Sequence, residues 1–151
     1  MEEIIITKAN DEERNWSAHL MAGSEPWITL GVSFNTCMEA CHHPDYLLYI
    51  AHTGNEPCGM MILHPRGVAS SPYLKTIAVD SSARGKGVGS VMLDFAEKLF
   101  SSQSIHFFLC VSSFNTDARA FYERHGYKQV GEFEDYIIEG ASEILMYKRL
   151  K

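Results

Sequence analysis

Three glycines at alternate positions, Gly85, Gly87 and Gly89, stand beside the cationic side chains of Arg84 and Lys86. Glycine within a helix or strand costs roughly 0.5–1 kcal/mol relative to alanine, so this spacing needs a local reason. One reason is a flexible turn with no further role. The other is a backbone that must come close to a bulky anion, because a glycine-rich turn at the start of a helix presents free N–H groups and the positive end of the helix dipole.

The residue spacing of this turn can be compared with that of two known nucleotide-binding loops. A P-loop requires a lysine followed by serine or threonine, whereas Lys86 is followed by Gly87. The dinucleotide fingerprint begun at Gly85 would need a third glycine at position 90, where the chain has Ser90. Neither spacing fits, so the turn predicts an anion site of another kind, with a tight turn without a ligand as the alternative.

The elements around the turn follow from the apolar periodicity. Residues 73–79 are typical of a strand, and a helix begins at Val88, where apolar residues recur at i, i+3, i+4, i+7 and i+11. The almost wholly apolar run 105–111 is typical of a strand covered on both faces. This strand–helix–strand crossover predicts that 73–79 and 105–111 are parallel neighbours.

The rest of the chain adds helices and antiparallel strands. Capping signals and turn residues predict the elements in this order: a strand over 2–9, a helix from Asn10 (capping box with Glu13) to about Met21, a break over 23–27, a short helix from Thr36 to near His43, strands over 46–52 and 58–64, a helix capped by Asn115 and ended by Gly126, and a closing pair over 127–138 and 143–150. The pattern favours an α+β fold with a mixed, mostly antiparallel sheet and a single domain over residues 1–151.

The glycine turn is similar to the acyl-CoA signature of the GCN5-related N-acetyltransferase family. That signature is Arg or Gln, two residues, Gly, one residue, and Gly or Ala, and here it reads Arg84, Gly87 and Gly89. The second signature of the family is an Asn followed seven residues later by a Tyr, with a Gly-aromatic pair just after, which Asn115, Tyr122 and the pair at 126–127 match. The resemblance is specific over 73–130, and the element order extends it to nearly the whole chain.

The resemblance implies the acyl-CoA N-acyltransferase fold, with helices on both faces of the sheet and the parallel strands splayed apart around the acyl-pantetheine arm. It implies acetyl-CoA as the co-substrate. It also implies that the cofactor contacts lie on the strand before the turn, on the turn and on the second crossover, namely Ile77, Ala78, Val79, Arg84, Gly85, Lys86, Gly87, Val88, Gly89, Ser90, Asn115 and Tyr122.

The reaction implied is direct attack by a neutral primary amine of a small molecule or protein on the acetyl thioester, in a ternary complex. An amide near Val79 would donate to the developing oxyanion, and Tyr122 would protonate the departing CoA thiolate. Without the motif, Tyr122 would be interpreted as a core aromatic. The segment 24–27 falls in one wall of the family's acceptor site, so Glu25, Trp27 and Phe34 are candidate acceptor contacts, with a loop whose tryptophan plugs the core edge as the alternative.

One position departs from a branch of the family. Enzymes that acetylate protein N-termini commonly carry a Glu twelve positions before the tyrosine, where this chain has Cys110. The candidates for a general base are then Glu25, His64, Glu132 and Glu134. The alternatives to an N-acetyltransferase are a non-catalytic acyl-CoA sensor and a nucleotide-binding protein.

The composition and net charge of the chain limit which classes of binding partner are expected. Thirteen cations against nineteen acids give 151 residues a net charge of −6, which argues against a general affinity for nucleic acid. No apolar run approaches the roughly 18 residues of a membrane span, and the acidic start lacks a signal peptide, so we expect a cytoplasmic protein without a membrane partner. The Cys37–His43 segment lacks a second ligand pair, which favours a helix end over a metal site. A homodimer is left open.

Overall fold

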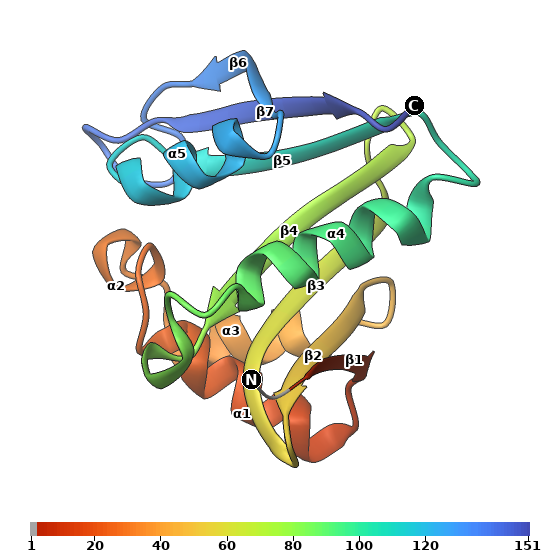
Figure 1. The fold of residues 1–151 in the computed structure, drawn as a ribbon. Helices are drawn as coiled ribbons and strands as arrows, with labels where there is room; N and C mark the ends of the chain where they lie inside the picture. The colour runs from red at the N-terminus through yellow and green to blue at the C-terminus, as the bar shows by residue number, and fades with distance from the viewer. Residues whose placement is uncertain (1–2) are drawn as a thin grey trace.

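Seven strands form one mixed sheet in the order β1-β2-β3-β4-β5-β7-β6 (Figure 1). The computed structural model describes residues 3–151. Along the chain the elements are β1 (Ile4–Lys8), α1 (Asp11–Ala22), α2 (Trp27–Leu30), α3 (Phe34–Cys41), β2 (Leu47–Thr53), β3 (Glu56–Val68), β4 (Ser71–Val79), a 3₁₀ turn (Ser81–Ala83), α4 (Val88–Phe100), β5 (His106–Ser112), α5 (Thr116–Arg124), β6 (Lys128–Phe133) and β7 (Glu143–Arg149).

The parallel pair predicted from the crossover is β4 and β5. Their registered partners in the described chain are Tyr73 with Phe108 and Leu74 with Leu109, and every other strand pair of the sheet is antiparallel. Beyond Leu74 the two strands diverge, which Figure 1 shows as the opening between β4 and β5. The splayed pair expected from the family resemblance is therefore confirmed.

A β-bulge explains where β4 leaves β5. On β3, Ile62 pairs with Thr76 and Leu63 pairs with Leu74, so Lys75 is an extra residue without a partner on β3. A bulge bends its strand and increases the local twist. The bulge follows directly on the last pair of β4 with β5, so the change in strand direction and the loss of pairing occur at the same place.

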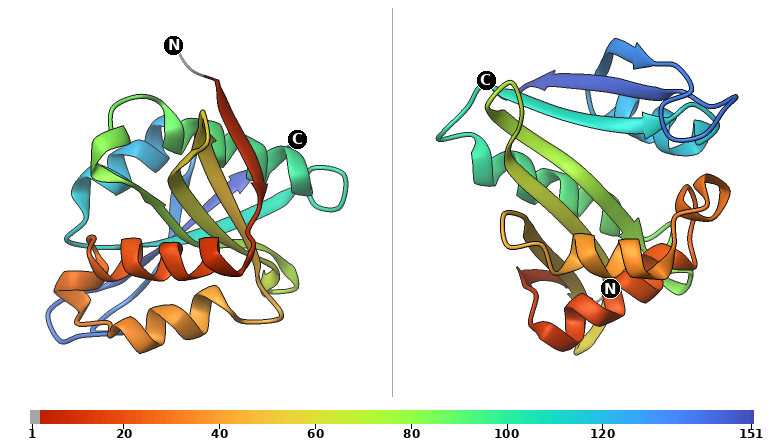
Figure 2. Two further views of the ribbon diagram at one scale, coloured as in Figure 1. Left: turned by 90° about the horizontal axis from the view of Figure 1, so that it is seen from below. Right: turned by 180° about the vertical axis from the view of Figure 1, so that it is seen from behind.

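Helices cover both faces of the sheet, as expected. Helices α1 and α3 lie side by side on one face, and α4 and α5 lie on the other (Figure 2). The apolar run of β3 serves both layers: Met60 and Ile62 pack in the core beneath α1 and α3, whereas Met61 and Leu63 pack in the core beneath α4. Burial on both faces is the reason why this strand shows no polar alternation.

The helices differ from the expected elements in two places. The short helix α2 was not among the expected elements, and Gly31 ends it in the left-handed conformation. Helix α3 begins at Phe34 because the Ser33 hydroxyl accepts a hydrogen bond from the Thr36 N–H at 3.1 Å, so Ser33 and not Thr36 is the cap. The capping box of α1, between Asn10 and Glu13, is confirmed.

The strand bounds also differ from the sequence-based ones. Strand β3 continues to Val68 through Pro65 and Gly67, because the pairing with β4 is irregular between His64 and Val68 and leaves the proline without a ladder position to fill. Strand β6 stops at Phe133, so residues 134–138 belong to the connection to β7. Within residues 3–151 no helix combines the length and apolar character needed to cross a bilayer.

Candidate active site

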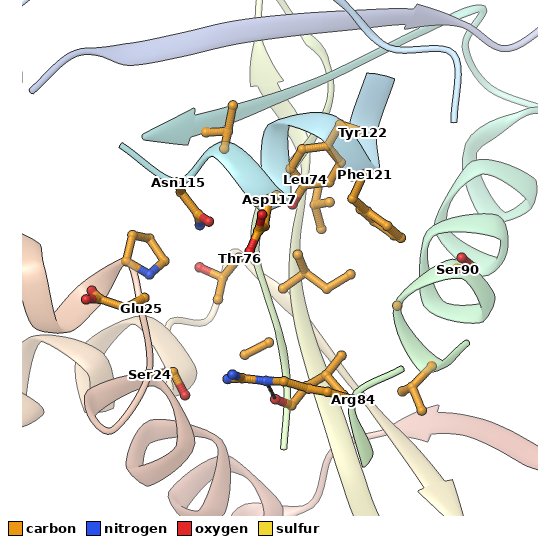
Figure 3. A pocket seen from close by; sticks show the side chains of 18 of the residues that line it. Ser24, Glu25, Leu74, Thr76, Arg84, Ser90, Asn115, Asp117, Phe121 and Tyr122 are labelled. Carbon is orange, nitrogen blue, oxygen red and sulfur yellow. Dashed lines mark hydrogen bonds between the residues drawn. The ribbon is translucent and has the colours of Figure 1, made fainter. Parts of the chain in front are cut away.

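A cavity of about 650 Å³ occupies the opening between β4 and β5 (Figure 3). It is lined by β4, by the turn and first residues of α4, by the end of β5, by α5, and by the segment before α2. Its volume lies in the range of small-molecule sites. The lining comes from three stretches of the chain, residues 24–27, 74–90 and 110–124, together with Glu143 of β7, and they meet where β4 and β5 diverge.

The glycine turn places an uncapped helix end at this cavity. Gly87 is the N-cap of α4 with φ of +83°, and Gly85 has φ of +76°, a left-handed region that strongly favours glycine. Among residues 3–151, no side chain caps α4 and no acid stands in its first turn. Helix α1, in contrast, has a side-chain cap and acids in its first turn. A Cβ at position 87 would meet nothing within 4 Å. The turn thus leaves free N–H groups and open space for an anion.

The edge of β4 that faces the opening is free for a second kind of contact. Ile77, Ala78 and Val79 line the cavity, beyond the last residue of β4 that pairs with β5. An extended ligand can add to such an edge as a further strand, through main-chain hydrogen bonds. Arg84 reaches back across the strand end, where its Nε donates to the Val79 carbonyl at 3.3 Å.

Tyr122 projects from α5 into the cavity near Leu74 (Figure 3). The side chain is 6% exposed, and burial raises the pKa of its phenol well above the ordinary value. The ring packs edge-on against Phe121 and Tyr127. Tyr122 is therefore both the core aromatic of the alternative interpretation and a fixed, neutral O–H donor at the cavity wall.

Asn115 stands at the N-cap position of α5, but its side chain makes none of the capping bonds formed by the described residues. The predicted capping role is therefore wrong: with ψ of 68° the residue departs from the extended conformation of a capping residue. The amide instead points toward the cavity (Figure 3). This leaves its donor and acceptor groups available to a ligand.

The structure brings most of the predicted site residues together. All of the predicted cofactor contacts line the cavity except Lys86, which is exposed on the turn. Glu25 and Trp27 also line it, but the Glu25 carboxylate accepts hydrogen bonds from the Thr29 N–H and hydroxyl, which lower its pKa. Phe34 is absent from the cavity lining and packs against His19, with ring centroids 4.5 Å apart.

A second cavity of about 510 Å³ adjoins the first one. The first is lined by residues of α4 and α5, and the second by residues of α1 and α3 and by the connection between β6 and β7. Five residues line both: Trp27, Lys75, Thr76, Cys110 and Glu143. The opening between β4 and β5 therefore joins the two faces of the sheet.

Two acids that line the first cavity, Asp117 and Glu143, were not among the expected site residues, and of these Glu143 lines both cavities. It opens β7, pairs with Ser112 at the end of β5, and its Oε2 accepts a hydrogen bond from the Ser112 hydroxyl at 2.6 Å. Its place beside Ser112 follows from the register of β7 on β5, which the residues around position 143 do not reveal by themselves.

The four earlier base candidates fare differently. His64, Glu132 and Glu134 line neither cavity, and Glu25 is bound to Thr29. Cys110 does line both, but burial, opposed in part by a hydrogen bond with Tyr73, raises the pKa of its thiol. A thiol with a raised pKa is a poor base near neutral pH.

Comparisons with known proteins agree with this geometry. The model of the Acetyltransferase (GNAT) family matches residues 10–127. A Bacillus subtilis (strain 168) protein named as a candidate acetyltransferase is 29% identical over 116 residues, 77% of this chain and 71% of its own. Two solved structures share the fold: a GNAT-family protein from Desulfovibrio desulfuricans (TM-score 0.82, 15% identity, 99% of this chain and 100% of that one) and an aminoglycoside 6'-N-acetyltransferase with coenzyme A (TM-score 0.78, 21% identity, 97% of each chain).

Proposed function

The chain belongs to the GNAT family of acetyltransferases, and from this premise we propose that it transfers the acetyl group of acetyl-CoA to a primary amine by direct attack in a ternary complex. The observation that carries the proposal is the uncapped start of α4, which opens onto the same cavity as the free edge of β4 and the Tyr122 phenol. Acetyl-CoA would supply the activated acetyl thioester. The residues of the chain then have three tasks: binding, orientation and proton transfer.

Binding would use the backbone. The first-turn N–H groups of α4 would hold the pyrophosphate, with Arg84 beside them, and the glycines keep side chains out of that space. The edge formed by Ile77, Ala78 and Val79 would hold the pantetheine amides, while Asn115 lies where it can bond the same arm. Fixing two reactants in one geometry can contribute roughly 7–11 kcal/mol to lowering the barrier, so positioning would be the largest contribution of the protein.

Proton transfer would use two side chains, Tyr122 in the first cavity and Glu143 where the two cavities meet. Tyr122 stays protonated because burial raises its pKa, so its hydroxyl can give a proton to the departing thiolate. The amine must lose a proton before it attacks, and Glu143 supplies a carboxylate on the side of the second cavity.

Replacing the phenol tests this function. Tyr122→Phe keeps the ring and its packing, and because general acid catalysis is typically worth about 10²–10⁴-fold, we expect kcat to fall at least tenfold with little change in the Kd for acetyl-CoA. The matched control is Tyr127→Phe, which removes another buried hydroxyl, one that donates to Glu97 at 2.8 Å and lines neither cavity. We expect the control to lose stability and keep kcat. Parent-like turnover by Tyr122→Phe, with chemistry rate-limiting, would leave Tyr122 a packing residue.

A further inference from the structure

The second cavity has an apolar wall. It is lined largely by aliphatic, aromatic and sulfur-containing side chains, among them Met21, Trp27, Leu30, Phe133, Tyr136 and Ile137, with the hydroxyls of Thr36 and Thr76 between them. Two charged residues accompany them, Lys75 and Glu143. A pocket with an apolar wall and a few polar groups is typical of a site for a small molecule whose body is apolar.

The outer part of this wall is formed by apolar side chains that remain exposed. Phe133, Tyr136 and Ile137 are 43%, 68% and 48% exposed, and the rings of Phe133 and Tyr136 lie 5.4 Å apart. The connection that carries them is closed by a hydrogen bond of 2.7 Å from the Gly140 N–H to Asp135 Oδ1. Apolar side chains that are exposed and gathered at a cavity mark a surface that a ligand or partner covers.

The charges at the inner end favour one cationic group. Lys75 Nζ lies 5.5 Å from the centroid of the Tyr46 ring, and Tyr46 does not line the cavity. Glu143 uses Oε2 to accept from Ser112, and among residues 3–151 no donor is bound to its Oε1. That oxygen is therefore available to an ammonium group of the ligand, where the two cavities meet.

We propose that the second cavity binds the acceptor, and that this acceptor is a monoamine with an aliphatic or aromatic body. The inference rests on the acetyl transfer proposed above. Glu143 holds the ammonium group at the opening and receives its proton, and the body lies against the apolar wall. A polyamine would place its further ammonium groups where the lining offers no second acid. An aminosugar would place more hydroxyls there than the four hydroxyl-bearing side chains of the lining can pair with, so both classes are disfavoured.

The chain's net charge of −6 suggests a different acceptor, namely a polycation. The lining of the cavity favours a monoamine over a polycation, because binding depends more on the charges that touch the ligand than on distant charges, which salt screens. Glu143 is the one acid among the residues that line this cavity.

The test measures binding and turnover with the same four amines. Hexylamine, 2-phenylethylamine, ethylamine and spermidine are titrated by calorimetry into the full chain saturated with CoA, and kcat/KM is measured with acetyl-CoA at the same pH. One buried methylene changes affinity roughly fourfold, so we expect hexylamine and 2-phenylethylamine to bind at least tenfold more tightly than ethylamine. We expect spermidine to bind at least tenfold more weakly than hexylamine.

Variants at exposed positions locate the binding. Tyr136→Ala and Ile137→Ser should weaken hexylamine binding about fivefold and leave ethylamine and acetyl-CoA unchanged. The matched control is Val130→Ser, which removes an apolar side chain that is 50% exposed on β6 and lines neither cavity. Glu143→Gln can still accept from Ser112 through its amide oxygen, and it should weaken every amine at least tenfold without changing the Kd for acetyl-CoA.

The outcomes separate this inference from the proposed function. Hexylamine bound no more tightly than ethylamine, or spermidine bound more tightly than hexylamine, overturns the inference even if acetyl transfer occurs. Equal effects of Ile137→Ser and Val130→Ser on hexylamine binding overturn it as well. The expected order of affinities without any acetylated product supports the cavity assignment and overturns the catalytic function, in favour of an acyl-CoA sensor.

Discussion

Replacing one glycine of the turn separates ligand binding from stability. Gly87→Ala places a methyl group where the structure has nothing within 4 Å, so it creates no clash in the free protein. The φ of +83° remains unfavourable for alanine, which costs about 1–2 kcal/mol. At roughly 2–4 °C per kcal/mol for a chain of this size, Tm should fall by about 2–8 °C.

The same methyl group occupies the space in which a pyrophosphate would lie on the first turn of α4. A hydrogen bond to a charged group contributes about 1.5–3 kcal/mol, and tenfold in Kd corresponds to about 1.4 kcal/mol. Losing one such bond should therefore raise the Kd for acetyl-CoA by about 10- to 150-fold. Isothermal titration calorimetry with acetyl-CoA and with free CoA measures this change directly.

Gly140→Ala is the matched control. Gly140 has φ of +85°, and a Cβ there also meets nothing within 4 Å, but this residue lies on the β6–β7 connection, outside the lining of the first cavity. We expect the same loss of Tm and an unchanged Kd. If both variants bind acetyl-CoA as tightly as the parent, the turn is a tight connection and the phosphate assignment is refuted.

Two further predictions concern titrating groups in the core. Burial raises the pKa of the Cys110 thiol, so iodoacetamide should modify it more slowly at pH 8 than it modifies N-acetylcysteine, and the midpoint of the rate–pH profile should shift to higher pH. The variant Cys110→Ser controls for the three other thiols. A midpoint equal to that of the free thiol would contradict the burial. Burial also raises the pKa values of Tyr73, Tyr122 and Tyr127, which means that the folded chain holds these protons more tightly than the unfolded chain does. The contribution of these phenols to the free energy of unfolding should be complete below the unfolded phenol pKa near 10. Above it, this free energy should fall by up to about 1.4 kcal/mol per pH unit for each phenol. Urea unfolding of the parent and of Tyr127→Phe between pH 8 and 11 should show a shallower fall in the variant.

The crossover was the part of the fold most accessible from the sequence. Two local patterns determine it: the apolar period of the helix from Val88 and the unbroken apolar run of β5. Both depend on burial over a short segment, which the chain expresses in residue types alone. The glycine spacing was equally informative, because the left-handed φ values at Gly85 and Gly87 strongly favour that residue type.

Features that depend on pairing between distant segments were less accessible. The bulge at Lys75 arises from the register of β3 with β4, and nothing in the letters around position 75 marks it. Glu143 was missed for the same reason, since its place beside Ser112 depends on where β7 starts along β5. The cap of α3 was predicted at Thr36, and Ser33 was not considered; which of the two forms the cap is decided by the geometry of one hydrogen bond.

The strand order of the second half of the sheet has a consequence for biosynthesis. Strand β7 lies between β5 and β6, so β5 pairs with the last strand of the chain and not with the next one. During translation, β1 to β4 can pair as soon as they leave the ribosome, because each is antiparallel to its predecessor in sequence. The half that carries Tyr122 must wait for Glu143–Arg149, and until then the edge of β5 and the apolar side chains beneath it are uncovered. A nascent chain therefore holds half of its site folded until Glu143–Arg149 have left the ribosome, and during this interval the uncovered edge of β5 can pair with other chains.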